Sequence, residues 1–338
     1  RGMDQAAQGR LARWLAGALG ESVVVRHIER LSGGAIQENW ALSLERQDGR
    51  EEAFVLRRDA GTQISSSRSR EAEFRILRAV HRAGITVPEP VALCSDETIL
   101  GRPFFLMRRI EGTADPRRLV GDDRLVPDRA AFGAALGAKL ARIHAIRPPA
   151  EELGFLEPPA ADPAAARIGA LRAALDRLSD PQPAIEWVLR RLERRRPRAA
   201  LVTLVHGDYR IGNIMVQDGN LAGVLDWEFA GWGDPDEDVG WLCARCWRFC
   251  RVDREAGGVA ERADFYNGYE ARTGRKVDAE RIRYWEAMAA VRWAIVALEQ
   301  GERNRGEEKP GLEAALTGRM APQLALEAMT NAATLGDA

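Results

Sequence analysis

Residues 201–213 read Leu-Val-Thr-Leu-Val-His-Gly-Asp-Tyr-Arg-Ile-Gly-Asn, an apolar run that passes directly into polar side chains. The run 201–205 predicts a strand, and two more strand-like runs follow at 214–216 and 221–225 before the chain reaches Asp226. A histidine, two aspartates and an asparagine therefore fall in loops at strand ends. Loops held by a rigid scaffold are where functional side chains concentrate. We expect the functional site in these loops.

The spacing of Asp208 and Asn213 gives this segment a chemical interpretation. It fits the pattern H-x-D-x-x-x-x-N of kinase catalytic loops, with Gly207 in place of the arginine. Phosphoryl transfer needs a carboxylate that orients the acceptor hydroxyl and accepts its proton, and side-chain oxygens that hold magnesium. We predict Asp208 as the catalytic base. Asn213 and Asp226 are the predicted Mg²⁺ ligands, because Mg²⁺ prefers hard oxygen donors.

Three further side chains are predicted to support this site. His206 is interpreted as a buried scaffold group that hydrogen-bonds the loop, since Asp208 already supplies a base. Glu228 could reach a second metal ion or only its waters. Asp238 lies in an acidic helix start after Pro235, where capping explains most of the acids, and it could also hold the backbone of the catalytic loop. Aspartate and asparagine are also common turn formers, so the ordered combination, rather than any single residue, favours the functional interpretation.

Hydrophobic periodicity predicts an α+β fold class, with a small antiparallel sheet followed by a larger, mainly helical part. The predicted elements are helix 4–19, strands 23–31, 40–44 and 54–56, helix 70–81, strands 91–94 and 104–107, and helices 129–146, 163–179 and 183–196. The first three strands are separated by turn-prone glycine segments, which is typical of a meander.

One of these glycine segments, Ser32-Gly33-Gly34, is a candidate phosphate-binding turn. Glycines let backbone amides approach phosphates without a Cβ in the way. A plain hairpin turn is the alternative interpretation. The position of the turn one strand before Arg57 favours the phosphate-binding interpretation.

Arg57 and Glu71 form a predicted pair at the nucleotide site. Kinases carry a lysine on this strand and pair it with a glutamate of the following helix. Arg57 and Glu71 occupy the corresponding positions, while Arg58 and Glu73 are competing choices for an ordinary surface pair. Arginine can bind phosphates in a bidentate manner, but its reach and geometry differ from those of lysine.

Composition favours a small-molecule partner. The 338 residues include 49 basic and 50 acidic residues, so the net charge is −1 and a global positive field for nucleic acid or anionic membranes is not expected. The longest apolar stretches fall short of the roughly 20 residues that a membrane span needs. Four cysteines are too few for a disulfide framework, and we expect a cytoplasmic protein. The sequence also lacks the P-loop and dinucleotide-binding glycine motifs.

Together these segments resemble the aminoglycoside phosphotransferase family, in particular the kinase-like domain fused to some acyl-CoA dehydrogenases. The segments that carry the resemblance are Leu31–Gly34, Val55–Arg58, Arg70–Glu73, Phe104–Met107, Val205–Asn213 and Leu225–Asp238. The resemblance covers nearly the whole chain. It implies a protein-kinase-like two-lobed fold, with a nucleotide-binding lobe at 1–107, a hinge at 108–112 and a helical lobe at 113–338 that holds the catalytic loop and the acceptor site.

The resemblance also implies an ATP site in the cleft between the lobes. Met107 would border the adenine, and the backbone of the hinge, including Arg109 and Ile110, would hydrogen-bond it. The implied activity is ATP-dependent and Mg²⁺-dependent phosphorylation of a hydroxyl of a small molecule, with GTP as a possible replacement for ATP. The sequence leaves the oligomeric state open.

The identity of the acceptor does not follow from the family, because acceptor pockets vary independently of the phosphate machinery. Polycationic aminoglycosides call for an acidic pocket. The late helix instead offers a mixed, largely apolar set: Tyr284, Trp285, Met288, Arg292, Trp293 and Glu299. This set favours a hydroxylated metabolite, including a hydroxyacyl-CoA, over an antibiotic, although aromatic residues at helical spacing are also typical of a core.

Two alternatives to a small-molecule kinase stay open. One is a nucleotide-binding pseudokinase or scaffold, for which Arg57 in place of lysine is the argument. The other is a protein kinase, which is disfavoured because Asp226-Trp227-Glu228 replaces the D-F-G segment and no A-P-E segment follows.

Overall fold

The chain forms two compact units. The computed structural model describes residues 3–31, 37–59, 67–198, 201–306 and 312–336. One unit comprises Arg1–Glu111 together with Ala222–Phe229, and the other comprises Gly112–Leu221 together with Ala230–Ala338. We call them the N-terminal unit and the C-terminal unit.

The N-terminal unit is built on a five-stranded antiparallel sheet with the strand order β1-β2-β3-β5-β4. Its elements are α1 (Gln5–Leu19), β1 (Val24–Arg30), β2 (Gln37–Glu45), β3 (Glu51–Asp59), α2 (Arg70–Arg82), β4 (Pro90–Cys94), α3 (Glu97–Leu100) and β5 (Phe104–Arg108). The predicted meander of the first three strands is confirmed by the β1–β2 and β2–β3 pairings.

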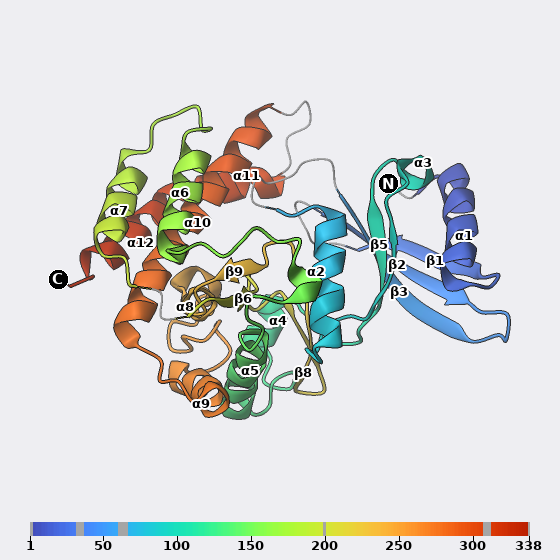
Figure 1. Ribbon diagram of the computed structural model, residues 1–338, viewed down its shortest axis with the longest axis horizontal. Coiled ribbons are helices and arrows are strands. Elements are labelled where there is room, and N and C mark those ends of the chain that lie inside the picture. The colour runs from blue at the N-terminus through green and yellow to red at the C-terminus, as the bar shows by residue number, and fades with distance from the viewer. Residues whose placement is uncertain (1–2, 32–36, 60–66, 199–200, 307–311, 337–338) are drawn as a thin grey trace. The chain divides into compact units, whose positions relative to one another are not determined.

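Helices cover both faces of this sheet (Figure 1). Side chains of successive strand residues point to opposite faces, so Phe104 and Phe105 of β5 serve different sides. Phe104 joins the core cluster that contains Leu11 and Leu15 of α1. Phe105 lies 5.7 Å, between ring centroids, from Phe74 of α2. Burial on both sides fixes the central strand β3, which carries Arg57.

The segment 222–229 joins the N-terminal unit through backbone hydrogen bonds. The Val224 amide donates to the Thr86 carbonyl at 2.9 Å, and the Arg68 amide donates to the Glu228 carbonyl at 2.9 Å. These bonds hold Asp226 and Glu228 in the same unit as β3 and α2.

The C-terminal unit is mainly helical. Its elements are α4 (Pro116–Gly121), α5 (Arg129–Ile143), η1 (Glu151–Leu153), α6 (Pro163–Leu175), α7 (Pro183–Arg194), β6 (Thr203–Val205), β7 (Ile214–Gln217), β9 (Gly231–Gly233), α8 (Asp236–Cys243), η2 (Arg245–Trp247), α9 (Arg262–Thr273), α10 (Ala279–Gly306), α11 (Leu312–Arg319) and α12 (Ala321–Ala333). Strand β6 pairs with β9, and β7 pairs with β8, which spans Asn220–Val224.

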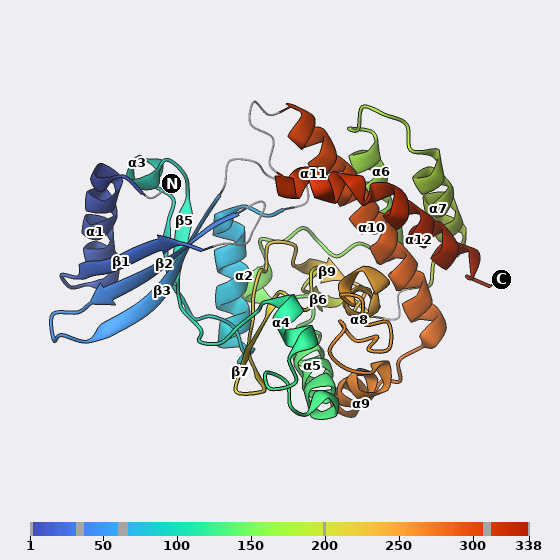
Figure 2. The same ribbon diagram turned by 180° about the vertical axis from the view of Figure 1, so that it is seen from behind.

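The long helix α10 is the centre of the core of this unit. It packs against α6, α7, α8 and α12, and Figure 2 shows it beside α7 and α12. Tyr284, Trp285 and Met288 are buried in this core, so these three members of the proposed acceptor set serve packing. Arg292 lies on the same helix and donates a hydrogen bond to the Gly207 carbonyl.

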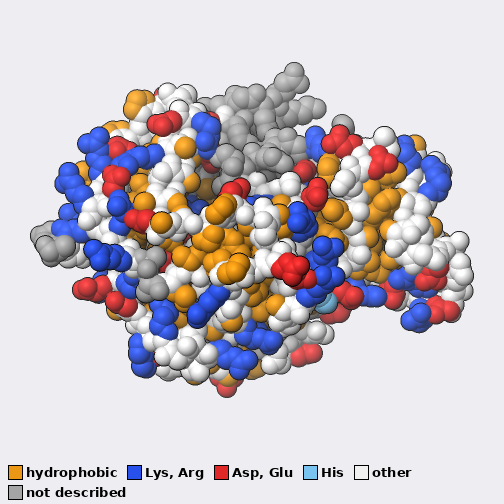
Figure 3. Space-filling model, viewed as in Figure 1, with side chains coloured by type: hydrophobic (Ala, Val, Ile, Leu, Met, Phe, Trp, Pro, Cys, Tyr) orange, Lys and Arg blue, Asp and Glu red, His pale blue; other side chains and the backbone are white. Residues whose placement is uncertain are grey.

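The surface agrees with the balanced composition. Figure 3 shows basic and acidic side chains intermingled over the visible face. Among the helices of the described residues, none combines the length and apolar character that crossing a membrane requires.

Candidate active site

The predicted catalytic base lies in a loop that begins directly after β6. This strand is buried throughout and pairs with β9, so the loop starts from a fixed point. Asp208 is only 7% exposed. Its Oδ1 accepts hydrogen bonds from Trp241 Nε1 at 2.8 Å and Arg210 Nε at 3.0 Å. Its Oδ2 accepts from Asn213 Nδ2 at 2.7 Å. Three donors thus fix the orientation of one carboxylate.

Asp238, on α8, holds the backbone of this loop. Its carboxylate accepts from the His206 amide at 2.7 Å and from the Gly207 amide at 2.9 Å. His144 Nε2 lies 3.1 Å from the same carboxylate. Burial alone would raise the pKa of Asp238, but the hydrogen bonds and charges of His144 and His206 outweigh it and lower that pKa. The geometry is the one predicted for Asp238.

His206 lies where a scaffold residue of this loop is expected. It is fully buried, and its Nδ1 accepts a hydrogen bond from the Asp208 amide at 3.1 Å. Gly207 between them has φ 78°, a left-handed conformation that glycine adopts without strain.

The other acids around the start of α8 are held mainly by arginine, which corrects the prediction that capping explains them. The Asp234 carboxylate accepts from the Asp236 amide at 2.9 Å, which is a cap-like bond. Arg281 bridges Asp234 at 2.6 Å and Asp236 at 2.7 Å. Burial and the neighbouring Asp236 carboxylate raise the pKa of Asp234 to about 6. Buried like charges at a helix start need such a cation.

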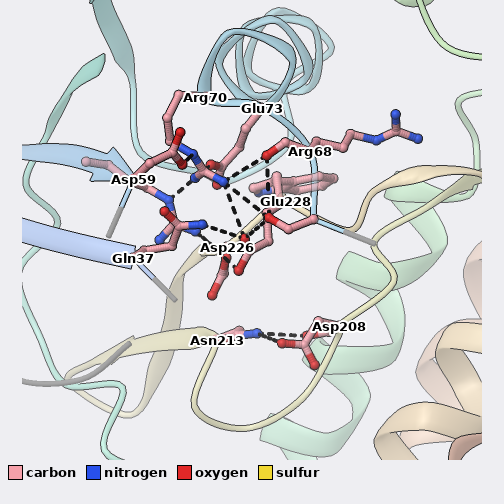
Figure 4. A network of polar contacts seen from close by, with 12 residues as sticks. Gln37, Asp59, Arg68, Arg70, Glu73, Asp208, Asn213, Asp226 and Glu228 are labelled. Atoms are coloured by element: carbon pink, nitrogen blue, oxygen red, sulfur yellow. Dashed lines mark hydrogen bonds and ion pairs between the residues drawn. The ribbon is translucent and has the colours of Figure 1, made fainter. Parts of the chain in front are cut away.

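Asn213 is hydrogen-bonded directly to the predicted base, Asp208. Its Nδ2 donates to Asp208 Oδ2 at 2.7 Å and to the Asp208 carbonyl at 3.0 Å, as drawn in Figure 4. Because the amide nitrogen is used in this way, the amide oxygen is the side-chain atom of Asn213 that could hold a cation.

Asp226 belongs to a buried polar network in the N-terminal unit. It has φ 66°, a left-handed conformation that aspartate tolerates better than most residues. Its Oδ1 lies 2.5 Å from Arg57 Nη2, and Arg57 Nε donates to Glu73 Oε2 at 3.1 Å. Figure 4 shows Asp226 and Glu73 within this network, which also includes Arg70.

The predicted pairing of Arg57 with Glu71 is wrong. Glu73 is 2% exposed and pairs with Arg57, whereas Glu71 is exposed. Arg58 does not pair with Glu73 either, because its Nε donates to Glu38 Oε2 at 3.1 Å. The physical reason is helical spacing: position 73 lies three residues from 70 and four from 77, on the face that α2 turns to the sheet.

Glu228 occupies the same network. Its Oε2 accepts from Gln37 Nε2 at 2.7 Å and from Ser67 Oγ, and it lies 3.3 Å from Arg70 Nη2. Burial and the neighbouring Asp226 carboxylate raise the pKa of Glu228 to about 7. In the described structure Glu228 is therefore a network member. Its predicted reach to a second metal ion or to metal-bound waters stays a prediction.

The predicted adenine-contacting residues lie at the end of β5. Met107 is half-buried and pairs with Val55 of β3. The amide of Arg109 donates to the Ala53 carbonyl at 3.0 Å, so this donor is engaged in the sheet. Ile110 follows directly and is half-buried. The predicted phosphate-binding turn Ser32-Gly33-Gly34 lies outside the described residues.

Sequence comparison decides the family. The model of the Phosphotransferase enzyme family matches residues 27–285. The chain belongs to this family. Membership confirms the predicted class of enzyme, a small-molecule phosphotransferase, and the resemblance on which that prediction drew.

Two curated relatives of this phosphotransferase are much longer proteins. It is 33% identical over 199 residues to acyl-CoA dehydrogenase family member 10 of Mus musculus, which covers 56% of this chain and 18% of that protein. It is 24% identical over 278 residues to a probable acyl-CoA dehydrogenase of Arabidopsis thaliana, which covers 72% of this chain and 32% of that protein. The chain thus spans less than a third of the length of either relative.

Solved structures confirm the predicted kinase-like fold. A putative aminoglycoside phosphotransferase from Ralstonia eutropha matches with a TM-score of 0.74 at 22% identity, covering 98% of this chain and 99% of that one. A thermostable mutant of another aminoglycoside phosphotransferase, solved as a ternary complex with AMP-PNP and hygromycin B, matches with a TM-score of 0.60 at 17% identity, covering 94% and 98%.

Sequence reasoning did not choose three residues that contact the predicted site residues. Glu73 and Arg70 could have been found from helical spacing, because they share the buried face of α2 with Phe74, Leu77 and Val80. Trp241 had no such signal, because its bond to Asp208 joins residues 33 positions apart.

Proposed function

We propose that this phosphotransferase transfers the terminal phosphate of ATP to a hydroxyl group of a small molecule. The observation that carries the proposal is the Asp208 carboxylate, which three donors orient in a loop whose backbone is held by Asp238. A base for phosphoryl transfer needs a fixed carboxylate, because most of the catalytic effect comes from positioning and electrostatics.

Asp208 would orient the acceptor hydroxyl and take its proton as the oxygen attacks in line. Arg57 would contribute to phosphate binding through the guanidinium donors of its fork. Burial alone would lower the pKa of Arg57, but the carboxylates of Asp226, Glu73 and Glu228 more than reverse this, so Arg57 stays cationic at every physiological pH.

The residues proposed to hold magnesium fit that ion chemically. The Asp226 carboxylate and the Asn213 amide oxygen are hard oxygen donors, which Mg²⁺ prefers. Asp226 already binds a cation in this structure, since Arg57 lies 2.5 Å from its Oδ1. When bound, Mg²⁺ would neutralise charge on the transferred phosphate. We keep ATP as the proposed nucleotide, with GTP as a second candidate.

We propose a hydroxylated metabolite as the acceptor, with hydroxyacyl-CoA compounds as the first to test. Two observations support this choice. The curated relatives are acyl-CoA dehydrogenase family members, whose names point to acyl-CoA compounds. In addition, Arg210 contacts the proposed base, so a positive charge lies where a polycationic aminoglycoside would have to approach. The four cysteines are free thiols, and we propose a reducing compartment such as the cytoplasm.

A phosphate-transfer screen tests the proposal. Purified protein would be incubated with Mg-ATP and a panel of hydroxyacyl-CoA compounds, sugars, amino alcohols, aminoglycosides and macrolides, and phosphorylated products would be detected by mass spectrometry. Asp208→Asn should lose turnover by at least about 100-fold while it still binds nucleotide. Asp218→Asn is the matched control, because Asp218 is exposed at the tip of the β7–β8 hairpin. Wild-type turnover by Asp208→Asn would refute the assignment of the base.

The same screen separates the alternatives. Arg57 in place of lysine is the observation that favours a nucleotide-binding scaffold. Calorimetric binding of Mg-ATP without transfer to any member of the panel would support the scaffold. Transfer to added proteins in place of small molecules would support a protein kinase.

A further inference from the structure

We propose that Trp241 and Arg292 are positioning residues that set the orientation of the Asp208 carboxylate. The inference rests on the proposed function, because it assumes that Asp208 is the base. Asp208, Trp241 and Arg292 all belong to the C-terminal unit.

Trp241 makes the direct contact. Its indole Nε1 donates to Asp208 Oδ1 at 2.8 Å, and the side chain is buried in α8. Indole has a single donor and no acceptor, so this bond fixes one oxygen of the base without competing for its proton. A hydrogen bond to a carboxylate is charge-assisted and stronger than a neutral one.

Arg292 supports Trp241 and the loop together. Its guanidinium carbon lies 4.4 Å from the centre of the Trp241 ring, which is cation–π geometry. Its Nη1 also donates to the Gly207 carbonyl at 2.6 Å. The two peptide groups that flank the Gly207 Cα are therefore both held, the Gly207 amide by Asp238 and the Gly207 carbonyl by Arg292. Arg292 comes from α10, 85 residues after the loop that it binds.

Arg292 also lies near a buried carboxylate. Glu237 lies 3.9 Å from Arg292, but it pairs more closely with Arg167, at 2.5 Å. Burial and the nearby Arg167 lower the pKa of Arg292 to about 10. Arg292 is still cationic at neutral pH, and its short hydrogen bond goes to the catalytic loop.

The contact itself can be tested without knowing the acceptor. The indole N–H signals of ¹⁵N-labelled protein would be recorded with and without Asp208→Asn. We expect the Trp241 signal to move, because its acceptor loses its negative charge. The Trp285 signal is the control, because this buried indole has no hydrogen-bond partner among the described residues. An unmoved Trp241 signal, assigned by triple-resonance spectra, would overturn the proposal even if no Trp241 variant folds.

Kinetics test the positioning role. Trp241→Phe keeps an aromatic ring for Arg292 but removes the N–H donor together with part of the indole ring system. The assay is hydrolysis of Mg-ATP, with water as the acceptor and ADP as the measured product. We expect its kcat to fall about 10- to 100-fold, while KM for ATP stays unchanged. Trp285→Phe makes the same chemical change in the core and should keep the wild-type kcat. Arg292→Lys should lower kcat as well. The fold loss of kcat in the double variant with Trp241→Phe should be smaller than the product of the fold losses in the two single variants.

The outcomes separate the inference from the proposed function. Wild-type turnover by Asp208→Asn would refute the proposed base. Loss of turnover by Asp208→Asn together with wild-type kcat in a folded Trp241→Phe protein would overturn the positioning role alone. A rise in KM for ATP without a fall in kcat would also overturn it, because that pattern indicates lost binding.

Discussion

Replacing Glu73 by glutamine removes one buried negative charge and keeps the size of the side chain, and we expect it to destabilise the N-terminal unit. In the wild-type protein Glu73 Oε2 accepts from Arg57 Nε at 3.1 Å and from Arg70 Nη1. Both arginines are buried, so the lost charge cannot be replaced by water.

The expected magnitude follows from the partners that remain. Breaking a buried ion pair by removing one partner costs about 3–5 kcal/mol. Arg57 keeps Asp226 at 2.5 Å, and Arg70 keeps Asp59 at 2.8 Å, so neither cation is left alone. We therefore expect the lower end, about 3 kcal/mol in the free energy of unfolding. For a unit of roughly 120 residues this corresponds to a fall of about 10 °C in the melting temperature.

Glu71→Gln is the matched control, because it makes the same change two residues away on an exposed position of α2. Its effect should stay within about 0.5 kcal/mol. Hydrogen exchange of the β3 amides in increasing urea would report the stability of the N-terminal unit specifically. Equal stability of the two variants would refute the reasoning, and a larger loss in Glu71→Gln would restore the pairing first expected from the sequence.

Three more outcomes follow from the C-terminal unit. Gly268→Ala should destabilise the protein by about 3 kcal/mol in thermal unfolding, because the added Cβ would lie 2.0 Å from the Ala134 carbonyl oxygen. The control is Gly169→Ala on α6, where the added Cβ would meet open space. It should leave the stability unchanged or raise it by up to about 1 kcal/mol. Burial raises the pKa of Asp234 to about 6 in the folded protein, above its value in the unfolded chain. Protonated Asp234 therefore stabilises the fold by about 3 kcal/mol below about pH 4, and this contribution is lost as the pH rises to 6. Urea denaturation of Asp234→Asn should therefore show a flatter pH dependence between pH 4 and 6. Asp238→Asn should lower the free energy of unfolding by about 3–5 kcal/mol at pH 7. Because the pKa of Asp238 is lowered in the folded protein, its carboxylate stabilises the fold above about pH 4, and this contribution is lost as the pH falls further. The control Asp218→Asn should change the free energy of unfolding by no more than about 0.5 kcal/mol.

Local sequence pattern was enough to predict the sheet and the loop that carries the proposed base. The first three strands and the strand before His206 are marked by β-branched or apolar runs between turn residues, and these signals depend only on near neighbours. The expected strand 201–205 is β6 (Thr203–Val205), and the expected helix 183–196 is α7 (Pro183–Arg194). The ends differ by a few residues because helix and strand termini depend on caps and packing.

The residues that contact the proposed base or its loop from other elements could not be predicted in this way. Trp241 follows a glycine in an apolar run and looks like any core residue, and Arg292 interrupts an apolar helix in the manner of a surface residue. Their roles arise from packing between α8, α10 and the loop after β6, which no local period encodes. Glu73 is different, because the period of α2 was sufficient to choose it over Glu71.

Arginine at position 57 makes physical sense once its three neighbours are known. Its Nε binds Glu73 and its Nη2 binds Asp226, while Glu228 lies 3.8 Å away. A planar fork can serve two carboxylates in fixed directions at once, whereas a lysine ammonium is a single compact charge. Glu73 and Glu228 add buried negative charge beside Asp226, so a lysine at position 57 would leave one of these carboxylates without a donor in the direction that it needs. Arginine in place of lysine at position 57 therefore fits the carboxylates around it. The replacement alone gives little reason to expect that catalysis is lost.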